Sequence, residues 1–414
     1  MKKIFTLIAL TIAFTVNAQN YNTNTGTESL NSITTGTNNS AFGYKSLESN
    51  SEGIKNTAVG AESLKLNTTG HWNSAFGYRS LRSNTSGDNN SAFGHLSLES
   101  NSEGDDNSAF GDLALEDNST GDYNTAVGYG VLKNNLTGGS NTAVGSRSME
   151  TNNSDFNTAI GYQSLAGNNW GMSITNANYN TALGYIALQI NEGSRNVATG
   201  AASLKSNSSG NDNTATGYYS LYSNTTASYN TAYGSQSLSN NTGAKNTAFG
   251  YRAKASTDNA TNQTIIGYEA TGQADNSIVL GNDDVTAVYM GEDSGAKVYA
   301  GEGSFTGNMT IGGDVVVSSD ARLKANIMSL GSTLAKLLLI DGKRYTMKKN
   351  GKQKIGVLAQ DIQKVFPELV TADDKEMLAV NYQGLVPVLI NALKEQDDKI
   401  SRLEKLVKKL ISDK

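Results

Sequence analysis

Short runs that alternate between polar and apolar residues return along most of the chain at a nearly fixed interval. The phrase Asn-(Ser/Thr)-Ala-(apolar)-Gly stands at 39–43 and returns at 56–60, 17 residues later. Further copies start at residues 73, 90, 107, 124, 141, 157, 180, 196, 213, 230 and 246, and degenerate copies stand at 264–267 and 277–281. A period of this kind indicates one structural unit stacked on the next.

Each unit predicts short strands and turns. The alternation at 39–42 is typical of a strand, and the glycine that follows permits a turn with positive φ. Ser-Leu pairs such as Ser46-Leu47 predict a second short strand. Frequent Gly and Asn and the lack of a 3.6-residue stripe argue against helix. Proline, which would interrupt strand ladders, is absent before Pro367. We therefore expect a mainly β chain, a parallel β-roll or β-solenoid with two strands and two turns per unit.

The small size of the recurring apolar residues predicts a thin roll. Alanines such as Ala41 and Ala58 suit a narrow interior, and the neighbouring Phe or Val and the later Leu supply larger apolar positions. About fifteen coils at about 4.8 Å each make a shaft of roughly 70 Å. So thin a roll buries little surface, so we expect several copies to associate side by side. The repeats are predicted to occupy 19–285.

A different hydrophobic period, in steps of 3 and 4 residues, predicts a coiled-coil helix over 386–410. Its seam consists of Val386, Leu389, Leu393, Gln396, Ile400, Leu403, Val407 and Leu410. One alternative is that the first turns pack on their own domain. Beyond Ile400 the helix is so charged that a partner helix is expected. The heptads alone, with β-branched residues at a and Leu at d, favour a dimer.

The N-terminus predicts an exported protein. Lys2 and Lys3 precede an apolar run at 4–16, and Val16-Asn17-Ala18 supplies small residues for a cleavage site. We expect a signal peptide at 1–18 and a secreted or cell-surface product. The apolar run is too short to span a bilayer, and no transmembrane segment is expected after its removal.

Composition narrows the possible chemistry. The chain has no Cys and two His, so thiolate metal sites are excluded and histidine triads or zinc sites are not expected; no cofactor or metal is expected. Residues 319–414 hold 18 Lys/Arg and 12 Asp/Glu. Their charges alternate in sign along the helix, which is typical of a solvated coiled coil, so no nucleic-acid partner is expected. Between repeats and this region, 286–318 carries β-prone pieces separated by glycines, predicted to be a β-rich neck.

Four segments of the C-terminal region occur in an order that resembles a known family. They are Ser319-Asp320-Ala321-Arg322-Leu323-Lys324, the stretch 355–370 with Gly356-Val357-Leu358-Ala359-Gln360 and Phe366-Pro367-Glu368, then Val380-Asn381-Tyr382, and the coil. Together they resemble the intramolecular chaperone domain of phage endosialidases and tail spikes, the S74 peptidase family. The repeats resemble the head repeats of trimeric autotransporter adhesins, which are left-handed parallel β-rolls, and the head-like repeats of tail fibres.

The resemblance implies a homotrimeric fibre with a small α+β chaperone and autoprotease domain at 319–414. It implies that Ser319 and Lys324 are the catalytic pair and that the chain is cut between Ser318 and Ser319. A serine hydroxyl needs a base, and a lysine serves if it is neutral, which requires burial or nearby cations such as Arg322. The competing interpretation is that Ser319-Asp320 caps a short helix and Lys324 lies on its surface.

Other functions remain open at this point. The chain is expected to act as an adhesin-like fibre that binds itself, with a surface glycan or a protein receptor as a further partner. The alternatives are a structural fibre that does not cleave and a glycan-binding or glycan-processing protein like a tail spike. The insert at 162–179 contains no Asp or Glu, which argues against a glycan hydrolase.

Overall fold

The computed structural model describes residues 21–167, 175–289, 309, 317–348, 351–372 and 376–413. The chain divides into two compact units, Met1–Val298 and Tyr299–Lys414. The predicted signal peptide and most of the predicted neck lie outside the described residues. Within the neck, the described residues 286–289 carry no strand.

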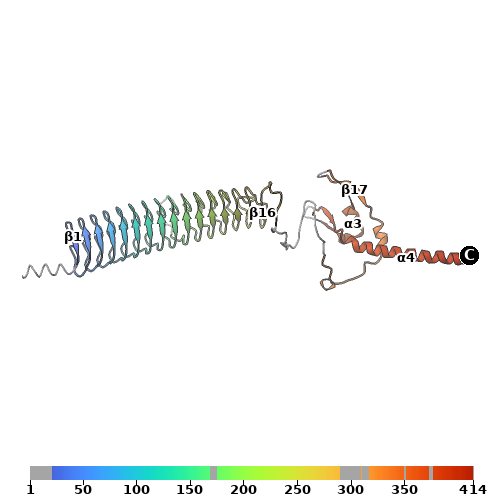
Figure 1. Cartoon of the computed structure of the whole chain (residues 1–414), viewed down its shortest axis with the longest axis horizontal. Helices are drawn as coiled ribbons and strands as arrows, with labels where there is room; N and C mark the ends of the chain where they lie inside the picture. The colour runs from blue at the N-terminus through green and yellow to red at the C-terminus, as the bar shows by residue number, and fades with distance from the viewer. Residues whose placement is uncertain are drawn as a thin grey trace, which may run out of the picture. The chain divides into compact units, whose positions relative to one another are not determined.

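The first unit is a parallel sheet of 16 strands stacked in chain order (Figure 1). Each strand is three residues long and pairs in register with the next, so that Ala41 of one coil lies opposite Ala58 of the following coil. The strands are β1 (Thr23–Thr25), β2 (Ser40–Phe42), β3 (Thr57–Val59), β4 (Ser74–Phe76), β5 (Ser91–Phe93), β6 (Ser108–Phe110), β7 (Thr125–Val127), β8 (Thr142–Val144), β9 (Thr158–Ile160), β10 (Thr181–Leu183), β11 (Val197–Thr199), β12 (Thr214–Thr216), β13 (Thr231–Tyr233), β14 (Thr247–Phe249), β15 (Thr264–Ile266) and β16 (Ile278–Leu280). The predicted parallel β-solenoid is confirmed.

Alanine and leucine fill the interior of the roll. Ala41 and Leu47 are both fully buried, and the equivalent residues of later coils are buried in the same way. Phe42, the apolar residue after the alanine, is 41% exposed and lies on the outer face. This follows from strand geometry, because successive side chains point to opposite faces and the alanine takes the inner one.

The predicted second strand in each unit is wrong. Ser46 and Leu47 lie in a turn, and Leu47 has φ of 50°. The same left-handed conformation recurs at Leu64, Leu81 and Leu98. It costs a non-glycine residue roughly 1–2 kcal/mol. The complete burial of each leucine offsets that cost, so one strand and a series of turns close each coil.

Rows of buried asparagines connect the coils. In one row, Oδ1 of Asn39 accepts the backbone N–H of Asn56 at 2.9 Å, while Nδ2 of Asn56 donates to the carbonyl of Gly70 at 2.8 Å. In a second row, Nδ2 of Asn67 donates to Oδ1 of Asn50 at 2.7 Å. Buried backbone groups need partners, and these amides supply them where the chain turns.

The second unit is small and mixes helices with antiparallel strand pairs, β17 with β18 and β19 with β20. Ile362, Phe366 and Val388 form its core. Its elements are η1 (Ala321–Leu323), α2 (Leu334–Leu337), β17 (Lys343–Thr346), β18 (Gln353–Gly356), α3 (Ala359–Val365), η2 (Pro367–Leu369), β19 (Val370–Ala372), β20 (Leu378–Val380) and α4 (Leu385–Ser412). The predicted α+β region ending in a long helix is confirmed.

Helix α4 has two different apolar faces. Val388 and Ala392 are buried, and α4 packs against α2. The seam predicted from the heptads is a separate face, and its apolar members from Val386 to Leu410 are exposed. Packing on its own domain therefore uses other residues and leaves the seam uncovered. None of the helices in the described part of the chain has the length and apolar character needed to cross a bilayer.

Candidate functional site

Ser319 and Lys324 lie in contact at the start of the second unit. Nζ of Lys324 donates a hydrogen bond of 2.6 Å to Oγ of Ser319. The turn η1 between them makes this possible, because the backbone N–H of Lys324 returns to the carbonyl of Ala321 at 3.1 Å. The two predicted site residues are thus brought together across five positions of sequence.

The residues between them form a second, independent pair. Asp320 is the N-cap of η1 and accepts the backbone N–H of Arg322 at 2.8 Å. The guanidinium of Arg322 also binds this carboxylate, with Nη2 at 2.7 Å from Oδ2. The side-chain hydrogen bond from Arg322 holds the pKa of Asp320 below its usual value. Arg322, expected as a free cation beside Lys324, is instead neutralised by Asp320. The capping interpretation holds for Asp320 alongside the Ser319–Lys324 contact.

The pair is surrounded by solvent in the single chain. All residues from 317 to 332 are exposed. A lysine amine takes a proton from a serine hydroxyl only in its neutral form, which burial or nearby cations favour. The geometry of a Ser–Lys pair is therefore present without the burial that would make the amine a base.

Sequence reasoning missed the group that fastens this segment to the rest of the unit. The carboxylate of Glu395 on α4 accepts hydrogen bonds from the Ser332 hydroxyl at 2.7 Å, the Thr333 N–H, and the Leu334 N–H at 3.2 Å. The Ser332 hydroxyl is the largest cause of a lowered pKa at Glu395. In the sequence Glu395 is one of many charged residues of the predicted coil, so nothing distinguished it.

The outer face of the roll carries a long apolar stripe. The rings of Phe76 and Phe93 stack at 4.7 Å between centroids, and those of Phe93 and Phe110 at 5.1 Å. The stripe consists of the exposed residues that follow the buried strand alanines: Phe42, Phe76, Phe93, Phe110, Val127, Ile160, Tyr233 and Phe249. Thr199 and Thr216 interrupt the stripe between Ile160 and Tyr233. An exposed apolar surface of this kind is typical of a protein–protein contact.

The second unit contains a region that is similar to a known protein family. Residues 319–371 match the family model Peptidase S74, described as the chaperone of endosialidase. A stretch of 92 residues is 34% identical to the long tail fibre protein Gp37 of Escherichia phage AR1 and covers 20% of this chain. The match spans only 8% of that protein. The matched family region begins at Ser319 and includes Lys324.

These findings describe a fibre-like protein. A parallel β-solenoid is followed by a Peptidase S74 chaperone domain, and domains of this family are typical of trimeric phage tail fibres and spikes.

Proposed function

We propose that the chain is an exported homotrimeric fibre whose C-terminal domain directs assembly and then cleaves itself off before Ser319. The observation that carries assembly is the uncovered seam of α4, where Leu393, Leu403 and Leu410 are each at least 60% exposed in the single chain. Exposed leucines at heptad spacing are stabilised by partner helices. The apolar stripe of the shaft gives the same copies a second surface of contact.

The trimer, rather than the dimer that the heptads alone favour, is supported by the family match at 319–371. Three copies whose stripes face a common axis would each cover the exposed phenylalanines of the others. The interior of each roll is already filled by alanine and leucine, so association is expected to stabilise the assembly without refolding the coils.

Cleavage is proposed to follow from the Ser319–Lys324 contact. A neutral Lys324 amine takes the proton from Ser319 Oγ, which attacks the carbonyl carbon of Ser318. The bond from that carbon to the Ser319 nitrogen breaks, the amine leaves with the proton returned by Lys324, and an ester joins Ser318 to Oγ. Water then hydrolyses the ester, which leaves a carboxylate on Ser318 and restores the Ser319 hydroxyl.

Assembly would switch this reaction on. The site is open to solvent in one chain, and copies packed around it would remove water from Lys324 and favour its neutral form. Because Arg322 is paired with Asp320, we propose that burial, rather than a neighbouring cation, favours the neutral form of the Lys324 amine. Only correctly assembled fibres would then lose the terminal 96 residues, 414 − 318.

The test is expression of the full chain beside Ser319→Ala and Lys324→Ala variants, with Met328→Ala, at a side chain that is 85% exposed, as a control in the same segment. Intact mass and light scattering give cleavage and oligomeric state. We expect a trimeric, cleaved wild type and control, and trimeric, uncleaved site variants. An intact wild-type trimer would reject the autoprotease and leave a structural fibre. A monomeric shaft would reject the fibre itself.

Export is proposed from the N-terminal sequence. Lys2, Lys3 and the apolar run at 4–16 support it. N-terminal sequencing of the protein recovered outside expressing cells is expected to begin at Gln19. Retention of the full N-terminus inside the cells would overturn this proposal.

A further inference from the structure

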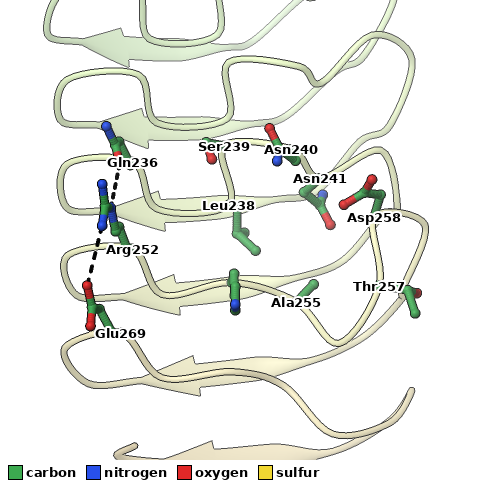
Figure 2. Close-up of a pocket in the computed structure, with 11 residues that line it drawn as sticks. Gln236, Leu238, Ser239, Asn240, Asn241, Arg252, Ala255, Thr257, Asp258 and Glu269 are labelled. Atoms are coloured by element: carbon green, nitrogen blue, oxygen red, sulfur yellow. Dashed lines mark hydrogen bonds and ion pairs between the residues drawn. The ribbon is translucent and has the colours of Figure 1, made fainter.

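A polar hollow of about 470 Å³ opens on the side of the roll near its C-terminal end (Figure 2). Figure 2 shows Gln236, Arg252 and Glu269 one below another along one wall, with Asn240 and Asp258 across from them. The full lining is Gln236, Leu238, Ser239, Asn240, Asn241, Arg252, Lys254, Ala255, Thr257, Asp258 and Glu269.

The hollow exists because the buried leucine row stops. Leu238 is buried, and its N–H bonds the Ala253 carbonyl at 2.9 Å. In the next coil Lys254 makes the equivalent bond to Ala270 at 3.0 Å, so it stands at the leucine position. Lys254 lacks the left-handed φ of the leucines and is exposed. No leucine then covers Leu238, which forms the floor of the hollow.

Polar groups of the lining are left without partners. Within the residues that the structure describes, the side chains of Ser239, Asn240, Lys254 and Asp258 make no hydrogen bond or ion pair. The opposite wall is fixed, since Arg252 Nε donates to Gln236 Oε1 at 2.7 Å. Free hydroxyl, amide, ammonium and carboxylate groups thus converge on one concave surface beside a rigid wall.

An aromatic cluster lies on the preceding coil, next to the lining residues Gln236 and Ser239 but outside the lining itself, and Nζ of Lys205 lies over its Tyr222 ring at 5.7 Å from the centroid. The rings of Tyr219 and Tyr222 stack at 4.6 Å, and the ring of Tyr218 lies 4.3 Å from that of Tyr219. The register places Tyr219 beside Gln236 and Tyr222 beside Ser239, through the bonds from Gln236 N to Tyr218 O and from Ser223 N to Ser239 O.

The aromatic cluster replaces charged residues. Two coils near the N-terminal end carry Glu62 with Lys65, and Arg79 with Arg82, at the positions that Tyr219 and Tyr222 occupy here, and those residues form ion pairs. The substitution by tyrosines next to the interrupted leucine row is therefore local to this part of the roll.

We propose that the hollow and its tyrosine border bind an oligosaccharide. A sugar ring presents an apolar face that packs on tyrosine, and hydroxyl groups that both donate to Asp258 and Asn240 and accept from Lys254. Two cations, Arg252 and Lys254, are balanced by Asp258 and Glu269, which disfavours a polyanionic ligand such as nucleic acid. This inference deepens the proposed fibre function, on which its role as a surface receptor site rests.

The hollow stays accessible if the fibre assembles as proposed. The apolar stripe follows the strands. The hollow lies elsewhere on the coil, between the turn that follows a strand and contains Gln236 and the return segment, which leads to the next strand and contains Asp258. Copies joined through the stripe would leave the return segments facing solvent.

The test uses the protein purified after expression of the full chain, on an array of defined neutral and acidic oligosaccharides, followed by calorimetric titration of the strongest binder. Asp258→Ala and Tyr222→Ala are expected to weaken binding at least tenfold. Glu103→Ala and Tyr123→Ala, which alter an exposed carboxylate and an exposed tyrosine elsewhere on the roll, are expected to bind as wild type.

Either of two results would overturn the site: no oligosaccharide bound by wild type, or equal binding by wild type and the two hollow variants. Oligomeric state and cleavage are measured on the same preparations. A cleaved trimer without binding rejects the oligosaccharide site alone. A monomer or an uncleaved chain that binds rejects part of the proposed function and retains the site.

Discussion

The carboxamide oxygen of Asn90 accepts a hydrogen bond of 3.0 Å from the backbone N–H of Asn107, one coil further along the roll. The same amide donates to the carbonyl of Gly104 at 2.7 Å. One side chain thus satisfies a buried backbone N–H and a buried carbonyl, and most of its equivalents along the shaft, such as Asn56 and Asn73, do the same. These rows connect neighbouring coils in addition to the packing of the narrow apolar interior.

The variant Asn90→Ala is expected to destabilise the shaft by about 2 kcal/mol, because it leaves the buried N–H of Asn107 without an acceptor and removes one of the two amide donors to the Gly104 carbonyl. The urea midpoint of unfolding, followed by circular dichroism, measures the loss. Asn134→Ala is the control, since Asn134 is only partly buried and its backbone N–H, rather than its side chain, contacts the next coil. Equal midpoints for the two variants would contradict the role of the asparagine row.

Close stacking at the first turn gives a second prediction. A Cβ on Gly43 would lie 2.6 Å from the carbonyl oxygen of Gly60, and its φ is 138°. Gly43→Ala is therefore expected to lower stability by about 3 kcal/mol or more. Gly130→Ala is the control: its φ is 59°, and the nearest atom to a Cβ lies 4.0 Å away. It should cost only about 1 kcal/mol.

Thermal or urea unfolding of the two glycine variants decides the point. A similar loss in both would mean that backbone conformation alone, and not the approach of the neighbouring coil, requires glycine at the first turn.

Ion pairs on the N-terminal coils predict a loss of stability in acid. The carboxylate of Glu62 accepts hydrogen bonds from Nε of Arg79 and from Nε of Arg82, both of 3.0 Å. Burial raises the pKa of Glu62, but hydrogen bonds from the arginines and the charge of Lys65 outweigh it, so the pKa lies below its usual value. Because the pKa of Glu62 is lower in the folded protein, its ion pairs stabilise the fold fully above the usual pKa of a glutamate. This stabilisation is lost as the pH falls through the lowered pKa.

The urea midpoint of wild type is therefore expected to fall more steeply than that of Glu62→Gln over roughly pH 5 to 3. Glu103→Gln is the control and should follow wild type, because in the described structure the Glu103 side chain forms no ion pair. Parallel curves for wild type and Glu62→Gln would contradict the prediction.

The uncovered seam of α4 predicts the effect of a single charge. Leu403 is 60% exposed and lies at a heptad position. Leu403→Lys is expected to reduce the assembled protein to single chains, because three lysines cannot share one apolar seam. Light scattering measures the mass. Glu404→Lys places the same residue one position away, off the seam, and should leave assembly intact; loss of assembly in both would point to charge alone.

The sequence predicts the architecture of the roll because the backbone of every coil requires the same residue types at the same positions. Glycine at position 43 and asparagine at position 39 recur wherever a turn or a buried N–H recurs. It does not predict that Leu47 is left-handed, since an alternating Ser-Leu pair also suits a strand, and only the stacked coils decide between the two. The Ser319–Lys324 pair followed from family resemblance, because five residues of separation do not by themselves specify the turn η1.

The hollow has a signal in the sequence, the interruption of the leucine row. Leucine, replaced once by Met149, returns one coil after another up to Leu238, and Lys254 breaks the row. Such a break predicts an unfilled interior. Its chemistry becomes visible only when the register brings Tyr222 and Asp258 to the same side of the roll.

Glu395 is expected to control the segment that contains the cleavage pair. Its carboxylate accepts hydrogen bonds from Ser332, Thr333 and Leu334. Ser319 and Lys324 lie in the exposed stretch just before these residues. The Ser332 hydroxyl and the Thr333 N–H lower the pKa of Glu395, so this anchor holds at neutral pH and weakens in acid as pH falls through the lowered value.

Glu395→Ala is expected to speed amide exchange at Thr333 and Leu334 at least tenfold and to slow self-cleavage. Asp398→Ala removes an exposed carboxylate one turn further along α4 and should change neither. Because exchange reports the anchor and intact mass reports the reaction, faster exchange with unchanged cleavage would show that Glu395 fastens the segment without positioning Ser319, and unchanged exchange would show that the carboxylate is not the anchor.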